Sequence, residues 1–245
     1  MLRLLFWRGY PRLLLLLFVV WFALWAVKPP HPADFVLEHV LTVVFVGFLI
    51  WNHRRFPLSN LSYTLVFVFL CLHVVGAHYT YAEVPYPAWF ARLGVDIQGL
   101  FAFERNHYDR LVHFSFGLLM AYPVREVFVR IARVRGFWGF YLPLDVMMSF
   151  SMLYELLEWW IAVVVAGDVG QSYLGTQGDV WDAHKDMALA STGGLITMTI
   201  SALVNWRLRR DFAQEWASSL GGADPGPLGE ERVREMLEQK QSERR

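Results

Sequence analysis

Six long apolar segments constrain this chain more than any other feature of its sequence. Each has roughly 17–25 residues or slightly more, which is what a helix needs to cross the core of a bilayer, and polar or turn-forming residues separate them. They cover residues 11–27, 35–51, 61–79, 109–131, 137–166 and 181–206. Of the 245 residues, 56% are hydrophobic, which is more than a soluble domain of this length needs. The sequence therefore predicts an all-α, polytopic membrane protein with a bundle of about six transmembrane helices.

Basic residues mark every second end of these segments. They lie before or at the start of the first segment and near or just after the ends of the second, fourth and sixth: Arg3, Arg8 and Arg12; His53, Arg54 and Arg55; Arg125, Arg130, Arg133 and Arg135; Arg207, Arg209 and Arg210. With six crossings, all of these ends fall on one side of the membrane, and the positive-inside rule makes that side cytoplasmic. We therefore expect both termini in the cytoplasm, a transmembrane domain over 1–210 and a polar cytoplasmic tail over 211–245.

The remaining composition limits the class of partner. The basic start and leucine run imitate a signal peptide, but "WAVKPPHPADF" offers no convincing cleavage site, so we expect a retained anchor. Lys+Arg and Asp+Glu balance at 22 each, which indicates no nucleic-acid partner. The single cysteine, Cys71, excludes an intrachain disulfide and CxxC zinc chemistry. The partner that these features predict is the lipid bilayer.

Acids and histidines gather at the segment ends opposite the arginines. They recur at helical spacings: Asp109 and His113 in "YDRLVHF", Glu155 and Glu158 in "YELLEWW", and Asp179, Asp182 and Asp186 in "GTQGDVWDAHKD". If the last helix begins near Asp179, its three acids share one face. An ionised carboxylate deep in a bilayer costs about 2.5–3.5 kcal/mol, so these groups need cations, protonation or a wet cavity.

The first hypothesis is a divalent metal site that opens toward the periplasm. Carboxylate and imidazole ligands at i, i+3 and i, i+4 suit Zn, Mg, Mn or Fe, and such a metal can activate water. The expected ligands are His113, Glu155, Glu158, Asp182 and Asp186. Asp109 would orient His113 and a carboxylate such as Glu158 would be the general base; His78, Arg110 and Asp179 would surround them. The expected substrate is a lipid or envelope-derived molecule.

Two other hypotheses explain the same residues. The acids could form an interhelical polar network without chemistry, or a proton or ion pathway. A pathway would need polar residues that continue to the cytoplasmic side, where few occur. We expect His39 and His73 to be satisfied core or interfacial histidines, and Glu38 to be a charge near a helix N-terminus. Gly193 and Gly194 predict close helix packing.

An ordered series of motifs resembles the YjdF-like family of bacterial inner-membrane proteins. The motifs are "HYTYAEVPY", "YDRLVHFSFG", "YELLEWW" and "QGDVWDAHKDMALASTGG", and the resemblance covers segments two to six. It implies a multi-pass protein of the bacterial inner membrane and leaves the activity open.

A more distant resemblance is to the VanZ-like membrane proteins linked to glycopeptide resistance, with their D-K-x-x-H-F, E-x-x-Q and D-x-x-x-N patterns. Here Arg110, Glu158 and Asp186 replace that lysine, glutamine and asparagine. The more acidic set strengthens the metal hypothesis and weakens a direct transfer of function.

Overall fold

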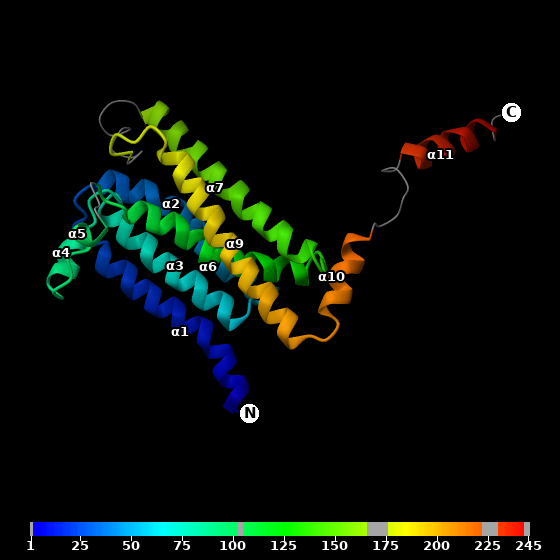
Figure 1. Cartoon of the computed structure of the whole chain (residues 1–245), viewed down its shortest axis with the longest axis horizontal. Coiled ribbons are helices and arrows are strands. Elements are labelled where there is room, and N and C mark those ends of the chain that lie inside the picture. The colour runs from blue at the N-terminus through cyan, green and yellow to red at the C-terminus, as the bar shows by residue number, and fades with distance from the viewer. Residues whose placement is uncertain (1, 102–104, 166–175, 222–229, 243–245) are drawn as a thin grey trace.

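The computed structural model describes residues 2–101, 105–165, 176–221 and 230–242, with side chains throughout except at 2–8, 165 and 230–232. Every regular element in these ranges is a helix (Figure 1). The helices are α1 (Leu2–Trp25), α2 (Pro32–Asn52), α3 (Asn60–His78), α4 (Tyr86–Ala91), α5 (Ile97–Phe101), α6 (Tyr108–Arg130), α7 (Trp138–Val165), α9 (Asp182–Leu208), α10 (Phe212–Leu220) and α11 (Glu230–Ser242). The predicted all-α class is confirmed.

The long helices coincide with the predicted apolar segments. Five of them, α2, α3, α6, α7 and α9, begin and end within three residues of the expected bounds, although residue 166, the expected end of the fifth segment, lies outside the described residues. The first helix is longer than expected and begins at Leu2, because its basic first turns are helical as well and hydropathy marks only the apolar part.

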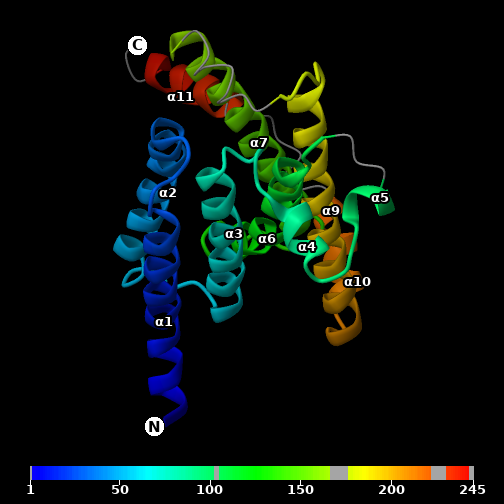
Figure 2. The same ribbon diagram turned by 90° about the vertical axis from the view of Figure 1, so that its left-hand side faces the viewer.

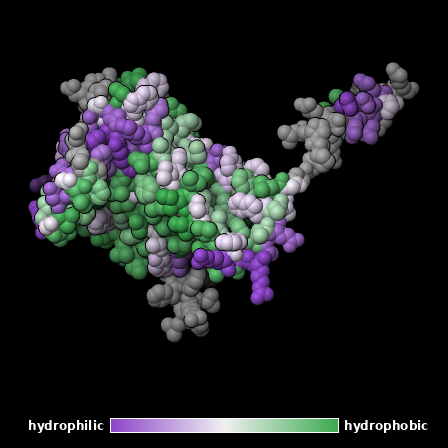
Figure 3. All heavy atoms as spheres, viewed as in Figure 1, coloured by the Kyte–Doolittle hydropathy of each residue, from purple (hydrophilic) through white to green (hydrophobic). Residues whose placement is uncertain are grey.

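Length and hydropathy support a polytopic membrane protein. The helices α2, α3, α7 and α9 are long and apolar enough to cross a membrane, and the described part of α1 adds a shorter apolar helix, Gly9–Trp25. Apolar side chains cover the middle of the bundle, and polar ones gather toward its ends (Figure 3). The polytopic class is therefore confirmed, whereas the number of crossings and the side of each terminus stay predictions.

The sixth helix, α6, occupies the centre of the bundle. It packs against α3, α7 and α9, while α7 also packs against α9, and α1 and α2 pack against α3. Figure 2, which views the end of the molecule that carries α4 and α5, shows α6 between α3 and α9. A helix enclosed in this way can carry ionisable residues, because its neighbours rather than lipid surround them.

The contact between α6 and α9 depends on glycine. A Cβ atom on Gly117 would fall on the backbone carbonyl of Ala190, and one on Gly193 would fall on the carbonyl of Phe114. The Thr197 hydroxyl also donates a hydrogen bond to the backbone carbonyl of Leu118. The two backbones therefore touch, as small residues allow in membrane bundles, and the prediction from Gly193 is confirmed.

The opposite end of the bundle carries α10. Phe212 is buried there, and its ring packs against Phe140 of α7 and against Trp216. The Arg209 guanidinium also pairs with Glu215 at 2.5 Å. The first part of the predicted tail is thus a helix that packs on the bundle, and the domain boundary at 210/211 stays a prediction.

Candidate functional site

The close contact of α6 and α9 brings an acid and a histidine together. His113 lies one turn before Gly117 in α6, and Asp186 lies one turn before Ala190 in α9. Asp109, His113 and Asp186 each offer one ligand atom, and these atoms all lie within 4.8 Å of one another. The side chains of His113 and Asp186 are buried. We refer to these three residues as the acid–histidine cluster.

The His113 ring lies between carboxylates from two helices. Its Nε2 atom is 3.5 Å from Asp109 Oδ1, one turn earlier in α6, and its Nδ1 atom is 3.6 Å from Glu155 Oε1 in α7. Glu155 is only 10% exposed at its side chain. Three predicted ligands, His113, Glu155 and Asp186, therefore converge, and Asp109 lies close enough to be a ligand rather than only a positioning residue.

Two oxygen atoms of this arrangement have unused hydrogen-bonding capacity. Within the described residues, Asp186 Oδ1 and Glu155 Oε1 are buried and lack a hydrogen-bond partner. A buried polar atom without a partner costs about 1–3 kcal/mol, and more when it is charged. Oxygen and imidazole donors of this kind fit a hard or borderline divalent cation such as Mg, Mn, Fe or Zn.

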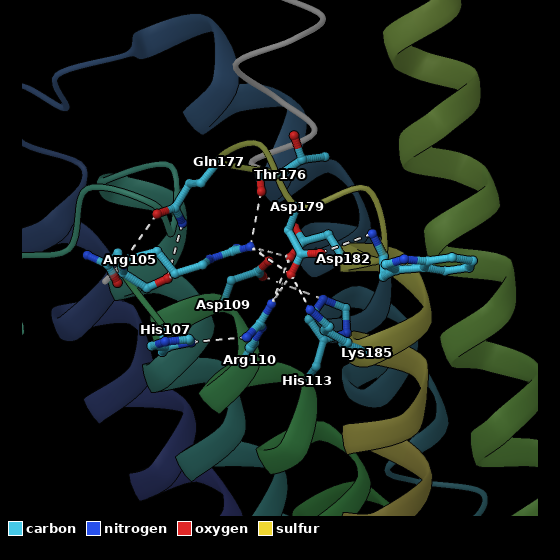
Figure 4. A network of polar contacts seen from close by, with 12 residues as sticks. Arg105, His107, Asp109, Arg110, His113, Thr176, Gln177, Asp179, Asp182 and Lys185 are labelled. Carbon is cyan, nitrogen blue, oxygen red and sulfur yellow. Dashed lines mark hydrogen bonds and ion pairs between the residues drawn. The ribbon is translucent and has the colours of Figure 1, made fainter. Parts of the chain in front are cut away.

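Asp179 and Asp182 take part in a group of ion pairs next to the cluster (Figure 4). Asp182 Oδ1 is 2.8 Å from Arg105 Nη1 and 3.5 Å from Arg110 Nη2. Asp179 Oδ2 is 2.5 Å from Arg110 Nη2, 2.6 Å from Lys185 Nζ and 3.4 Å from Arg105 Nη1. These five charged residues, called the ion-pair layer below, bring together the predicted Arg110 and Asp179. Within the layer, Asp182, which we expected to be a metal ligand, pairs with the guanidinium groups of Arg105 and Arg110.

The last long helix begins after Asp179, so Asp179, Asp182 and Asp186 do not share one helical face. The helix α9 begins at Asp182, whereas Asp179 precedes it in a turn and accepts a hydrogen bond from the Trp181 amide at 3.1 Å. The Lys185 ammonium, this amide and the Arg110 guanidinium hold the pKa of Asp179 at about 2, below its ordinary 3.8. Only Asp182 and Asp186 therefore share the helical spacing. Gly175, at the start of this stretch, lies outside the described residues.

Two other predicted residues are not among the three residues of the cluster. Glu158 is half-buried one turn beyond Glu155 in α7, near the Tyr154 hydroxyl. His78 lies where α1 and α3 end: its Nδ1 atom is 2.6 Å from the Trp25 carbonyl, and its ring meets the Trp25 and Tyr79 rings edge-on. These contacts indicate that His78 packs α1 against α3 and does not surround the cluster as we expected.

A second polar group surrounds Glu38, which we expected to be a charge near a helix N-terminus. Glu38 is buried, and its Oε2 atom accepts hydrogen bonds from the Tyr154 hydroxyl at 3.2 Å and the Tyr81 hydroxyl at 3.4 Å. The Tyr81 hydroxyl also lies 2.6 Å from His73 Nδ1. The Tyr154 ring packs edge-on against His113, 5.8 Å between centroids, so this group adjoins the cluster.

Two features of the sequence could have identified Glu38. It lies in the second turn of α2, beyond the first turn in which a helix dipole stabilises an acid. Its partner Tyr81 belongs to "HYTYAEVPY", one of the motifs that carry the family resemblance. Tyr81 follows α3 in a turn where Thr80 and Tyr81 have φ of 55° and 54°, and its ring occupies the space that a Cβ on Gly76 would need.

Most of this chain is similar in sequence to known proteins. A family model described as "Predicted membrane protein (DUF2238)" matches residues 10–207, which include every residue of the cluster and of the ion-pair layer. The Inner membrane protein YjdF of Escherichia coli (strain K12) is 38% identical over 178 residues, covering 72% of this chain and 81% of that protein. No solved structure matches. The chain therefore belongs to the DUF2238 family of membrane proteins and, like its YjdF relative, is a protein of the bacterial inner membrane.

Proposed function

We propose that the protein binds a divalent cation at the acid–histidine cluster and acts there on a lipid or envelope-derived substrate. The observation that carries the proposal is the pair of buried oxygens, Asp186 Oδ1 and Glu155 Oε1, which have no hydrogen-bond partner among the described residues. They flank His113, and Asp109 supplies a third carboxylate within reach. A cation among Asp109, His113 and Asp186 would satisfy Asp186 Oδ1, while Glu155, beside the other nitrogen of the His113 ring, would hold that ring in place.

The proposed ligands are Asp109, His113 and Asp186, and Glu155 from a third helix would hold the other nitrogen of the His113 ring. A Zn, Mg, Mn or Fe ion bound there would supply Lewis acidity toward an ester or phosphoryl oxygen and would lower the pKa of a bound water. Glu158 is the remaining carboxylate on the same helix as Glu155, and we assign it the role of general base. In this proposal, Asp182 acts by holding Arg105 and Arg110 next to the cluster rather than by binding metal.

The setting favours a substrate that reaches the site from the bilayer or the outer surface. The cluster lies near the beginnings of α6 and α9, at the end of the bundle where α4 and α5 lie (Figure 1). In the predicted topology this is the periplasmic end. The ion-pair layer next to the cluster contains three cationic side chains and two acidic ones, so it favours a substrate with negative charge.

A polar network without turnover is the second candidate function. The observation that favours it is the mutual pairing within the ion-pair layer, where each of the five charged side chains has an opposite partner. Such a network fixes the register of neighbouring helices without a ligand. It accounts for the ion-pair layer but not for the buried oxygens of Asp186 and Glu155 that lack a hydrogen bond among the described residues.

Metal analysis of the purified, detergent-solubilised protein distinguishes the two candidates. The proposal expects about one divalent ion per chain by elemental analysis, lost in Asp186→Asn and Glu155→Gln. The matched control is Asp145→Asn, an exposed acid in α7 that lies ten residues before Glu155, about 15 Å along the helix. No stoichiometric metal in the wild-type protein after incubation with Zn, Mn, Mg and Fe salts would exclude the metal function and leave the network.

A further inference from the structure

A cavity separates α1 and α2 in the half of the bundle that lies far from the acid–histidine cluster. Its volume is about 250 Å³, and α1, α2 and α3 line it together with the residues that follow α2. At the other end of these helices, the Phe22 ring lies 6.0 Å from Phe35 and 4.9 Å from His39. The two helices therefore meet at one end and leave an open groove toward the other.

The walls of this groove are apolar along most of its length. Leu14 and Phe18 of α1 line it together with Val66 and Leu70 of α3, and all four are buried. Leu49 of α2 lines the third side. At 250 Å³ the cavity is slightly smaller than the roughly 300–1,000 Å³ of sites that enclose a whole drug-sized molecule. It therefore suits part of a long apolar chain.

The mouth of the groove is basic. Arg12 of α1 and Arg54, just after α2, line it with exposed side chains, and His53 lies beside them with Nδ1 2.7 Å from the Tyr63 hydroxyl. All of the lining residues are described, and none of them is acidic. Two guanidinium groups at the end of an apolar groove match a molecule with a negative head and an apolar tail.

The position of the mouth selects one class of such molecules. It lies at the end of α1 and α2 that the positive-inside rule assigns to the cytoplasm. The cytoplasmic leaflet contains anionic phospholipids, which attract juxtamembrane arginines. Free phosphate would make no use of the apolar walls, and a zwitterionic lipid would leave the positive mouth without a matching net charge.

We propose that the groove between α1, α2 and α3 binds one anionic phospholipid of the cytoplasmic leaflet. The phosphate lies between Arg12 and Arg54, and an acyl chain lies along Leu14, Phe18 and Val66. This site is separate from the acid–histidine cluster and does not depend on the metal function.

Native mass spectrometry of the whole protein in detergent tests the proposal with phosphatidylglycerol and phosphatidylcholine of the same acyl chains. The wild-type protein should retain one phosphatidylglycerol in preference to phosphatidylcholine. The double variant Arg12→Gln, Arg54→Gln should bind phosphatidylglycerol at least about tenfold more weakly, because it removes both guanidinium groups at the mouth of the groove.

The matched control removes the same charge at the same end of the molecule. Arg207 and Arg210 are also exposed but do not line the groove, so Arg207→Gln, Arg210→Gln should leave phosphatidylglycerol binding unchanged. An equal loss in both double variants, or equal retention of the two lipids by the wild-type protein, would overturn the proposal.

A second variant tests the apolar part with the charges intact. Leu49 is half-buried on the wall of the groove, and Leu49→Trp should fill the cavity and reduce phosphatidylglycerol retention by a similar factor. Monodisperse elution and an unchanged helical circular dichroism spectrum show that the variant is folded. A folded Leu49→Trp protein that retains the lipid as the wild type does would contradict the assignment of the chain to this groove.

Discussion

The contact between α6 and α9 and the space between α1 and α2 are opposite solutions to packing helices in a membrane. At the first, Gly117 and Gly193 let two backbones touch, and the ionisable residues one turn away are brought within reach of each other. Between α1 and α2, large apolar side chains such as Phe18 and Leu49 leave a cavity with arginines at its mouth. The difference indicates that small residues, rather than hydrophobicity, set where this bundle is tight enough to position chemistry.

The largest expected effect follows from adding a single methyl group at the tight contact. Gly117→Ala would place a Cβ atom on the Ala190 carbonyl, and backbone cannot move aside as a flexible side chain can. We expect a loss of roughly 1–3 kcal/mol or more in unfolding free energy, together with loss of metal binding. Thermal unfolding in detergent measures the loss of stability.

The control for this substitution is Gly47→Ala in α2. A Cβ atom there would have no neighbour within 4 Å, so the change should be neutral or stabilise by up to about 1 kcal/mol through helix propensity. Equal behaviour of the two alanine variants would show that α6 and α9 do not touch as described.

The next effect concerns the response of stability to metal. A ligand that binds only the folded state at 100 times its dissociation constant should stabilise the wild-type protein by about 2.7 kcal/mol. Asp186→Asn should abolish this response without lowering the stability of the metal-free protein, because the buried Oδ1 atom has no described hydrogen-bond partner to lose. A destabilised metal-free variant would instead favour the polar-network function.

A smaller effect should distinguish the ion-pair layer from the cluster by its dependence on pH. The pKa of Asp179 is about 2 in the folded protein, below its ordinary 3.8. Its contribution to stability is therefore complete above about pH 4 and is lost as the pH falls toward 2. Asp179→Asn should lower the melting temperature at pH 7, and the difference from the wild type should shrink below pH 4.

An exposed pair provides the comparison for this measurement. Asp211 is 68% exposed and lies 3.4 Å from Arg209, so Asp211→Asn should change the melting temperature little at any pH, as surface pairs usually do. A pH-independent effect of Asp179→Asn would show that its pairing with Arg110 and Lys185 does not lower its pKa.

The smallest effect is expected at the groove. Val46 lines the cavity between α1 and α2 and is only half-buried, so Val46→Ala should cost less than about 0.5 kcal/mol. Val74 of α3 is fully buried in the core, and Val74→Ala should cost roughly 1–2 kcal/mol from lost packing. Similar costs for the two valines in thermal unfolding would mean that the groove is closed in solution.

The sequence predicted the elements of this fold better than the pairing within its site. Helix length and apolar composition define segments in a bilayer, so most helix ends were predicted closely, and i, i+4 spacing correctly placed Asp109 beside His113. Helical periodicity does not extend into loops. It therefore could not show that Arg105, which precedes α6, pairs with Asp182, a predicted ligand. Nor could it show that Tyr81, in a turn, reaches Glu38.

The turn that holds Tyr81 makes the residues allowed at positions 76 and 81 depend on each other. The Tyr81 ring fills the place of the side chain that Gly76 lacks, while its hydroxyl serves His73 and Glu38. A larger residue at position 76 would expel the ring and leave a buried carboxyl without one of its donors. The two positions should therefore covary among related proteins: glycine at 76 wherever tyrosine is at 81, and free variation at 76 only after the tyrosine is lost.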